Sequence, residues 1–150
     1  MYCTFGSKVN NTLASLLSTI ISSQTGHFVE TKSDPYRIML SSSARIGKKH
    51  VENIFREDYD ICAVLIASLA GTYNLNWRVW NVAKKFGIVD KAATYDKRIA
   101  RIIYDRYSKT PLSEESLREL IHDKYDISLT NSVMSDVRND HIKIHWYELN

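Results

Sequence analysis

The sequence predicts an α+β fold that is predominantly α-helical and carries a small N-terminal β-hairpin. Apolar residues recur at helical spacing through most of the 150 residues, and two short β-prone runs lie near the N-terminus. The apolar fraction of 44% and the charged fraction of 25% are those of an ordinary globular protein. The chain is therefore long enough to bury a core as one domain or two very small ones.

The N-terminal third predicts a helix, a hairpin and a second helix. Residues 11–23 carry leucine and isoleucine at helical spacing, with Asn10 or Asn11 as the N-cap. The hairpin covers residues 27–42, because HFVET and YRIMLSS are β-prone and the intervening KSDP is a turn signal. Residues 42–55 then predict an amphipathic helix capped by a serine.

The rest of the chain predicts further helices, each with its own cap or breaker. Asp60 caps an apolar helix that reaches about Tyr73, and Asn76 caps a helix over 77–86 that Gly87 ends. The remaining predicted segments are a helix from Lys91 to about Tyr107 capped by Asp90, a helix that starts at Ser113 after Pro111, a helix over 128–139, and a strand or extended tail over 141–149.

These elements group into three expected modules packed as one compact unit. Residues 1–58 form an N-terminal α+β module, residues 59–111 form a helical core, and residues 112–150 form an acidic helical module. No repeat, low-complexity tract or linker rich in proline and glycine separates them.

Charge is distributed unevenly along the chain, although the net charge is only +3. Residues 61–111 carry nine lysines and arginines against three aspartates, a net charge of +6. Residues 112–150 carry eight acidic and four basic residues, a net charge of −4. The basic segment indicates a polyanion partner, although solvated helix surfaces can have the same composition.

The stretch VAKKFGIVDKAATYDKRIARI has the spacing of a helix–turn–helix. Such a motif needs a small residue where its helices meet and a glycine at positive φ in a turn of three or four residues. Ala83, Gly87 and Ile88 have this spacing. Residues 77–104 therefore resemble the helix-turn-helix superfamily of DNA-binding domains, which implies a helix-turn-helix core and a helix from Lys91 in the major groove of double-stranded DNA.

The helix from Lys91 is expected to have an apolar inner face and a polar outer face. Tyr95, Ile99 and Ile102 lie among the inner residues, whereas Asp96 departs from the superfamily pattern, in which an apolar residue is usual. Arginine suits guanine edges, threonine can contact a thymine methyl, and lysines at the end of the first helix can fix the register through phosphates. The candidate DNA-binding residues are Lys91, Thr94, Lys97, Arg98, Arg101, Lys84, Lys85 and Arg78.

Two other segments resemble nucleic-acid-binding units. Residues 113–140 have an order similar to winged-helix units, but their acidic side chains would repel phosphates, which favours packing or dimerisation. Residues 13–55 resemble the opening of a LAGLIDADG homing-endonuclease unit, in which the first helix ends at a metal-binding acid. The first acidic residue here is Glu30, so the resemblance implies a DNA-binding unit without cleavage.

The remaining residue types predict no catalytic, metal or cofactor site. Cys3 and Cys62 lie far apart without a partner motif, the histidines are scattered, and no glycine-rich phosphate loop is present. No apolar run reaches the roughly 18 residues that a membrane span needs, and the N-terminus does not have the pattern of a secretory signal. We therefore expect a cytoplasmic, intracellular protein without a membrane partner.

The sequence thus favours a non-catalytic, sequence-specific DNA-binding protein, a transcriptional repressor of phage or mobile-element type. Its partner would be double-stranded DNA, and a homodimer would form through the C-terminal module. One alternative is a helical protein–protein adaptor with a basic docking face. A second alternative is a DNA-binding protein similar to a homing endonuclease. Retention on a heparin or DNA column would distinguish a DNA-binding protein from an adaptor.

Overall fold

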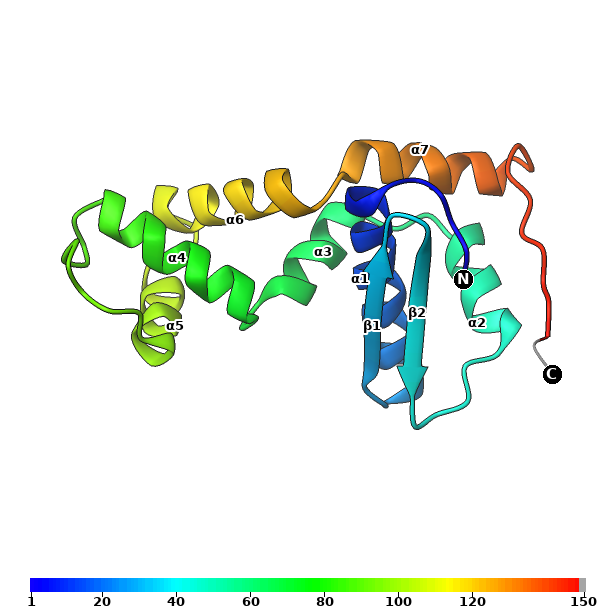
Figure 1. The fold of residues 1–150 in the computed structure, drawn as a ribbon, viewed down its shortest axis with the longest axis horizontal. Helices are drawn as coiled ribbons and strands as arrows, with labels where there is room; N and C mark the ends of the chain where they lie inside the picture. The colour runs from blue at the N-terminus through cyan, green and yellow to red at the C-terminus, as the bar shows by residue number, and fades with distance from the viewer. Residues whose placement is uncertain (149–150) are drawn as a thin grey trace. The chain divides into compact units, whose positions relative to one another are not determined.

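The computed structural model describes residues 1–148 and confirms a predominantly α-helical α+β fold with a small N-terminal hairpin (Figure 1). Two compact units divide the chain: the first unit comprises Met1–Val64 and the chain from Asp126 onward, and the second unit comprises Leu65–Tyr125. The elements in chain order are α1 (Ser7–Thr25), β1 (Val29–Asp34), β2 (Arg37–Ser42), α2 (Lys48–Arg56), α3 (Ile61–Leu69), α4 (Tyr73–Lys85), α5 (Lys97–Arg106), α6 (Pro111–Lys124) and α7 (Ile127–Arg138).

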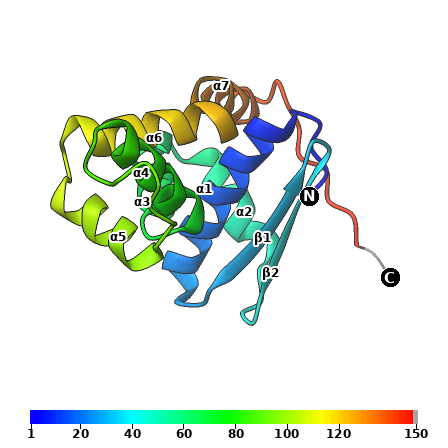
Figure 2. The same ribbon diagram turned by 60° about the vertical axis from the view of Figure 1, so that its left-hand side comes forward.

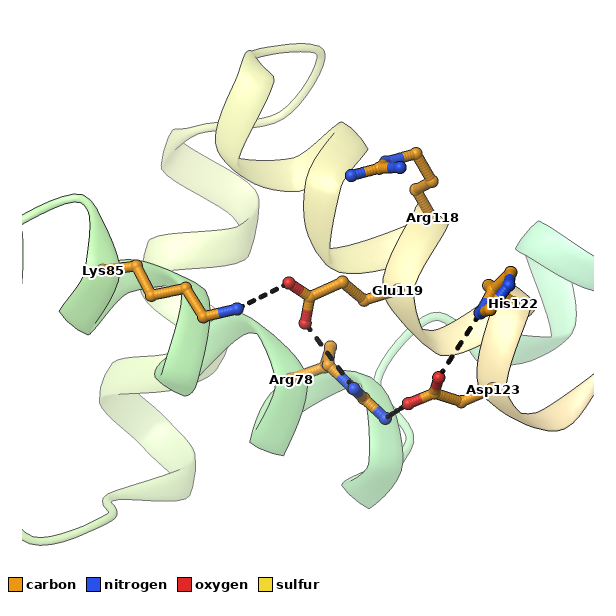
Figure 3. Close-up of a pocket in the computed structure, with 6 residues that line it drawn as sticks. All are labelled: Arg78, Lys85, Arg118, Glu119, His122 and Asp123. Carbon is orange, nitrogen blue, oxygen red and sulfur yellow. Dashed lines mark hydrogen bonds and ion pairs between the residues drawn. The ribbon is translucent and has the colours of Figure 1, made fainter.

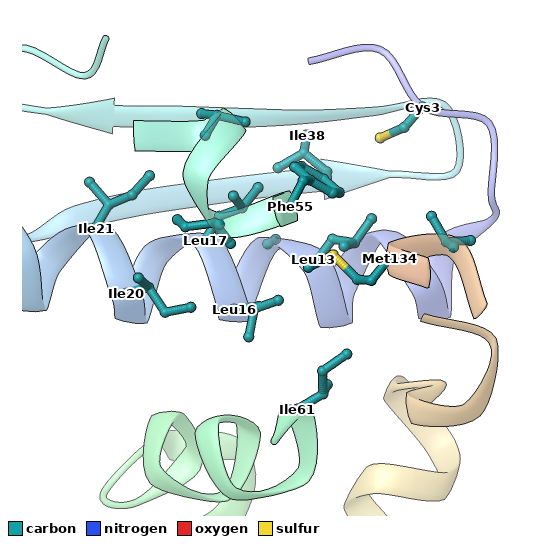
Figure 4. Packing of buried hydrophobic residues seen from close by; sticks show 14 of the residues in the cluster. Cys3, Leu13, Leu16, Leu17, Ile20, Ile21, Ile38, Phe55, Ile61 and Met134 are labelled. Atoms are coloured by element: carbon teal, nitrogen blue, oxygen red, sulfur yellow. The ribbon is translucent and has the colours of Figure 1, made fainter. Parts of the chain in front are cut away.

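The core of the first unit forms around α1, which packs against the hairpin, α2 and α7. Burial of each large aliphatic side chain in such a core stabilises the fold by about 1.5–3 kcal/mol. Figure 4 shows these side chains between α1 and the elements that cover it. They include Leu13, Leu17 and Ile21 of α1, Ile38 of β2, Phe55 of α2 and Met134 of α7.

The hairpin confirms the strand prediction, and local turn chemistry explains its register. Val29 pairs with Ser42 at one end of the ladder, and Asp34 pairs with Arg37 at the other. The Asp34 carboxylate accepts backbone N–H groups of Tyr36 at 2.9 Å and Arg37 at 3.0 Å. The acid therefore closes the two-residue loop between the strands, as an aspartate before proline is expected to do.

Both helices of the N-terminal third begin at positions that the sequence did not predict. The helix α1 starts at Ser7, so both candidate caps, Asn10 and Asn11, lie inside it, and Asn10 is fully buried. The Asn10 Nδ2 amide donates to the backbone carbonyls of Cys3 at 2.9 Å and Asp34 at 2.8 Å, which ties the N-terminal segment to the hairpin turn. The helix α2 starts only at Lys48, so the serine cap predicted for it is also wrong.

The apolar helix predicted from Asp60 is shorter than expected and is followed by a separate helix start. The Asp60 carboxylate accepts a backbone N–H of the first turn at 3.0 Å, which confirms it as a cap. The chain turns at Gly71, whose φ is 75°, and the Thr72 hydroxyl accepts a first-turn N–H of α4 at 3.3 Å. Asn76, the predicted cap of this helix, is instead buried within α4.

In the second unit, α4 packs against both α5 and α6 and lies between them (Figure 2). Because α4 contributes buried side chains on two sides, its position fixes α5 and α6. The buried apolar side chains of the three helices are Leu75, Val79, Trp80, Val82 and Ala83 of α4, Ala100 and Ile103 of α5, and Leu112 and Leu120 of α6.

The C-terminal part keeps its predicted helices with shifted starts. The helix α6 begins at Pro111 with Thr110 as its cap, and Ser113, the predicted cap, completes the first turn by accepting the Thr110 N–H at 3.2 Å. Residues 141–148 contain no strand, and residue 149 of the predicted tail lies outside the described residues. Within residues 1–148, no helix combines the length and apolar character that crossing a membrane requires.

Candidate nucleic-acid interface

The predicted helix from Lys91 does not exist in its first two turns. Residues 86–96 form a loop, and α5 begins at Lys97. The Asp96 carboxylate caps α5 by accepting the backbone N–H groups of Arg98 at 2.8 Å and Ile99 at 3.0 Å. Asp96 therefore departs from the apolar pattern because it is the N-cap. The eleven-residue loop 86–96 replaces the turn of three or four residues that a helix–turn–helix needs.

The end of α4 is formed as predicted. Gly87 has a φ of 73°, and its N–H donates to the carbonyl of Lys84 at 3.2 Å. The N–H of Ile88 donates to the carbonyl of Ala83 at 3.0 Å, which completes a Schellman motif. The glycine at this position therefore ends α4 and directs the chain into the loop.

The faces of α5 differ from those predicted for a recognition helix. Ala100 and Ile103 are buried against α4, whereas Ile99 is 47% exposed and Ile102 is 61% exposed. The predicted inner residues Ile99 and Ile102 thus lie on the surface. The later start of the helix explains this error. Tyr95, which helped to define the inner face of the predicted helix, lies in the loop, so the buried face is set by the helix from Lys97 alone.

Three predicted site residues, Lys97, Arg98 and Arg101, lie together on α5 and are exposed. We call them the open face, because within residues 1–148 none of their side chains forms an ion pair. Two other predicted residues, Lys91 and Thr94, are exposed in the preceding loop and not on a helix. The open face and this loop present cations to solvent within one continuous stretch of chain.

Lys84 serves the loop itself. Its ammonium donates to the backbone carbonyl of Lys91 at 3.1 Å and lies 5.9 Å from the ring centroid of Trp80. A lysine over an indole face is attracted by the negative potential of the ring. Lys84 therefore holds the middle of the loop against α4.

Arg78 and Lys85 of α4 are paired with acids of α6 (Figure 3). Lys85 Nζ lies 2.7 Å from a Glu119 oxygen, and Arg78 lies 3.5 Å from Glu119 and 2.7 Å from Asp123. We call these four residues the paired face, and they line a depression of about 310 Å³ together with Arg118 and His122. The positive charges that the sequence assigned to DNA are balanced here within the protein.

The electrostatics of the paired face agree with its geometry. A hydrogen bond from Lys85 holds the pKa of Glu119 below its ordinary value, and the charges of Lys85 and Arg78 act in the same direction. A hydrogen bond from Arg78 likewise lowers the pKa of Asp123. Both carboxylates are therefore stabilised in the charged form, and their ion pairs with Arg78 and Lys85 hold α6 against α4.

An aromatic cluster connects α4 to the loop before α5. Tyr95 of the loop contacts Tyr73, Trp77 and Trp80 edge-on, with ring centroids 5.1–5.8 Å apart. Among the described residues, the Tyr95 hydroxyl and the Trp80 indole N–H are buried without a hydrogen-bond partner. Burial also raises the pKa of Tyr95. Ring contacts thus hold the loop to α4, although they leave these two polar atoms buried without a hydrogen bond among the described residues.

Sequence reasoning missed the acidic partners and most of the aromatic cluster. Glu119 and Asp123 are four residues apart, and Arg78 and Lys85 are seven apart, so each pair lies on one helix face. This spacing, with the opposite charges of the two segments, is the signal that could have predicted the paired face. Trp80, the ring of the cluster that lies deepest in the protein, is 3% exposed. No group of three or more histidine, cysteine, aspartate or glutamate side chains within residues 1–148 is arranged to hold a metal ion.

The comparisons with known proteins correct the family resemblances that the sequence suggested. A protein-family model described as DEAD/H associated matches residues 1–150. No curated protein and no solved structure shows a significant match to the chain. The family match overturns the resemblance of residues 77–104 to the helix-turn-helix superfamily and of residues 13–55 to a homing-endonuclease unit, although the helix–hairpin–helix order is present in α1, β1, β2 and α2.

The same match contradicts the predicted function of a phage-type transcriptional repressor, with its regulatory role and its sequence-specific recognition of DNA. It points to a function associated with helicases, which agrees with a nucleic-acid-related role in its general form. Double-stranded DNA as the ligand and a homodimer stay predictions. Because the match spans the whole sequence, the chain belongs to the DEAD/H associated family.

Proposed function

We propose that the chain is a non-catalytic accessory domain in a DEAD/H helicase system, and that its open face binds the phosphate backbone of nucleic acid. The observation that carries this proposal is the unequal pairing of cations in the second unit. Arg78 and Lys85 have carboxylate partners, whereas the open face has none within residues 1–148. Unpaired lysine and arginine side chains gain most from binding phosphates, because binding releases counterions.

The charge of the second unit supports a polyanion ligand. Residues 65–125 contain eleven lysines and arginines against seven acidic residues, a net charge of +4. Three of the acids, Glu115, Glu119 and Asp123, are paired with cations of α4 and α6, and Asp96 is used as a helix cap. The acids therefore neutralise the α4–α6 side more than they neutralise α5.

Sequence-independent binding follows from the same geometry. Binding to phosphates fixes position but carries no base sequence, and base reading by a helix-turn-helix needs a second helix that follows a short turn. The loop 86–96 stands where that turn would be.

The non-catalytic part of the proposal is supported by the depression on the paired face, whose carboxylates are already bound to Arg78 and Lys85.

The test is a fluorescence anisotropy titration of the chain with labelled nucleic acids. We expect similar affinities for two duplexes of unrelated sequence, and likewise for two single strands. The double variant Arg98→Ala with Arg101→Ala should weaken binding to all four by about tenfold or more, because it removes two charge-assisted hydrogen-bonding groups. Circular dichroism checks that the variant is folded. Unchanged affinity of a folded variant, or no binding by the native chain, would contradict the proposal.

A further inference from the structure

Two aromatic side chains of α4 lie on the surface of the second unit beside the loop. Tyr73 is 61% exposed and Trp77 is 43% exposed. They are one helical turn apart, and their rings are nearly parallel, with planes at 13° and centroids 6.4 Å apart. Large aromatic rings are normally stabilised by burial, so a parallel exposed pair provides an apolar surface without a covering element in the described chain.

The Tyr95 ring packs against both rings of the exposed pair and supports them. The Tyr95 ring meets Tyr73 at 80° and Trp77 at 69°, and it meets the buried Trp80 at 87°. Edge-to-face packing of this kind favours a single orientation of each ring. A ligand that stacks on the pair would therefore find two rings already oriented, which reduces the entropic cost of binding.

The open face begins at Lys97, two residues after Tyr95 in the sequence. Tyr95 precedes the cap Asp96 and the open-face residue Lys97, so the Cα atoms of Tyr95 and Lys97 are at most about 7 Å apart. The Asp96 carboxylate between them accepts the first-turn N–H groups of Arg98 and Ile99 and thus caps α5. A stacking surface next to unpaired cations matches a ligand that carries both flat rings and phosphates.

We propose that Tyr73 and Trp77 form a stacking platform for the unpaired bases of a single-stranded nucleic acid whose phosphates contact Lys97 and Arg98. This inference rests on the proposed function and specifies its ligand. Bases in a single strand can leave their neighbours and stack on protein rings, as they do in single-strand-binding proteins. Bases in a duplex are paired and stacked on one another, so they cannot reach the platform. The platform therefore selects single strands, whereas the open face binds both forms.

The experiment measures binding of the whole chain to a labelled single strand, to a duplex, and to an abasic strand with the same phosphates and no bases. The variants are Tyr73→Leu and Trp77→Leu, which keep apolar bulk and remove the ring. Trp77→Phe is the matched variant that keeps a ring. Tyr36→Leu, at a tyrosine that is 68% exposed in the hairpin turn, is the control for removal of an exposed ring elsewhere.

We expect Tyr73→Leu and Trp77→Leu to weaken single-strand binding by about 5- to 100-fold, because each stacked base contributes strongly to affinity. Duplex affinity should stay within about twofold, and Tyr36→Leu and Trp77→Phe should retain most of the single-strand affinity. The native chain should bind the abasic strand about 5- to 100-fold more weakly than it binds the normal strand. This last comparison needs no variant, so it holds even if a leucine variant does not fold.

Equal affinity of the native chain for the normal and abasic strands would overturn the platform. So would equal decreases in single-strand and duplex affinity in folded leucine variants. In either case the proposed function survives if Arg98→Ala with Arg101→Ala still weakens binding to all ligands. Failure of that charge variant to change any affinity would instead overturn the proposed function, so the two failures are distinguishable.

Discussion

The paired face and the open face contain the same kinds of basic residue in one basic segment, yet they differ in what neutralises them. On the paired face, Glu119 and Asp123 of α6 lie 2.7 Å from Lys85 and Arg78 respectively. On the open face, the side chains of Lys97, Arg98 and Arg101 have no ion pair within residues 1–148. The comparison teaches that a basic stretch of sequence can divide into a structural part and a binding part. Tertiary packing, and not composition, determines which is which.

The largest expected effect comes from breaking the paired face at its shared acid. Glu119→Ala removes the partner of both Lys85 and Arg78, which should lower the free energy of unfolding by about 1–2 kcal/mol. The freed cations should also raise nucleic-acid affinity several-fold, since the paired face would then resemble the open face. Chemical denaturation and anisotropy measure the two effects. Glu115→Ala is the control, because its partner Arg118 has a side chain that is 74% exposed, and its effect should stay within about 0.5 kcal/mol.

Acid should weaken the ion pairs of the paired face, whereas the open face contains no carboxylate that acid could protonate. The pKa values of Glu119 and Asp123 are lowered in the folded protein, so below about pH 4.5 the unfolded chain binds more protons than the folded one. Their contribution to stability is therefore complete at neutral pH and disappears as the pH falls through the folded-state values. Unfolding measured from pH 7 to pH 3 should show this decline. Glu119→Gln combined with Asp123→Asn should give a shallower decline, and an identical pH profile would refute the assignment.

The smallest expected effect concerns the support of the loop that leads to the open face. Tyr95→Phe keeps the edge-on packing against Tyr73, Trp77 and Trp80 and removes a buried hydroxyl without a partner among the described residues. We expect stability to stay equal or rise by up to about 1 kcal/mol, because an unpaired buried polar group is unfavourable. Tyr95→Leu, which removes the ring, should be destabilised. A clear decrease in the stability of Tyr95→Phe would show that the hydroxyl has a favourable role.

Local chemistry made part of the fold predictable from the sequence. Asp34 before proline predicted the hairpin turn, Asp60 predicted the start of α3, and Gly87 predicted the end of α4, because each acts on backbone groups within a few residues. Asn10 and Asn76 have the same capping chemistry, yet both are buried inside helices. Asn10 donates to the carbonyls of distant segments, and such hydrogen bonds leave no signal in the local sequence.

The candidate site was predictable to a similar extent. The sequence indicated that the basic residues of the middle segment and the acidic residues after them are separated. It named Lys97, Arg98 and Arg101 only among eight candidate DNA-binding residues, and their binding role stays a prediction. It did not indicate that Asp96 and not Asp90 is the cap of α5, because both aspartates can cap a helix. The Tyr95 ring packs against α4 just before Asp96, which holds residues 91–95 out of a helix. The pairing of α4 with α6 likewise joins residues too distant in sequence for local patterns to reveal.

The salt dependence of single-strand binding tests most directly the claim that the open face binds phosphates and the paired face does not. For a single strand, the slope of the logarithm of the binding constant against the logarithm of salt concentration changes by about 0.7 for each phosphate that the protein neutralises. We predict that Arg98→Gln with Arg101→Gln reduces the magnitude of this slope by about 1.4, whereas Arg78→Gln with Lys85→Gln leaves it unchanged. Equal reductions in the two double variants, or a reduction only in the paired-face variant, would contradict the account.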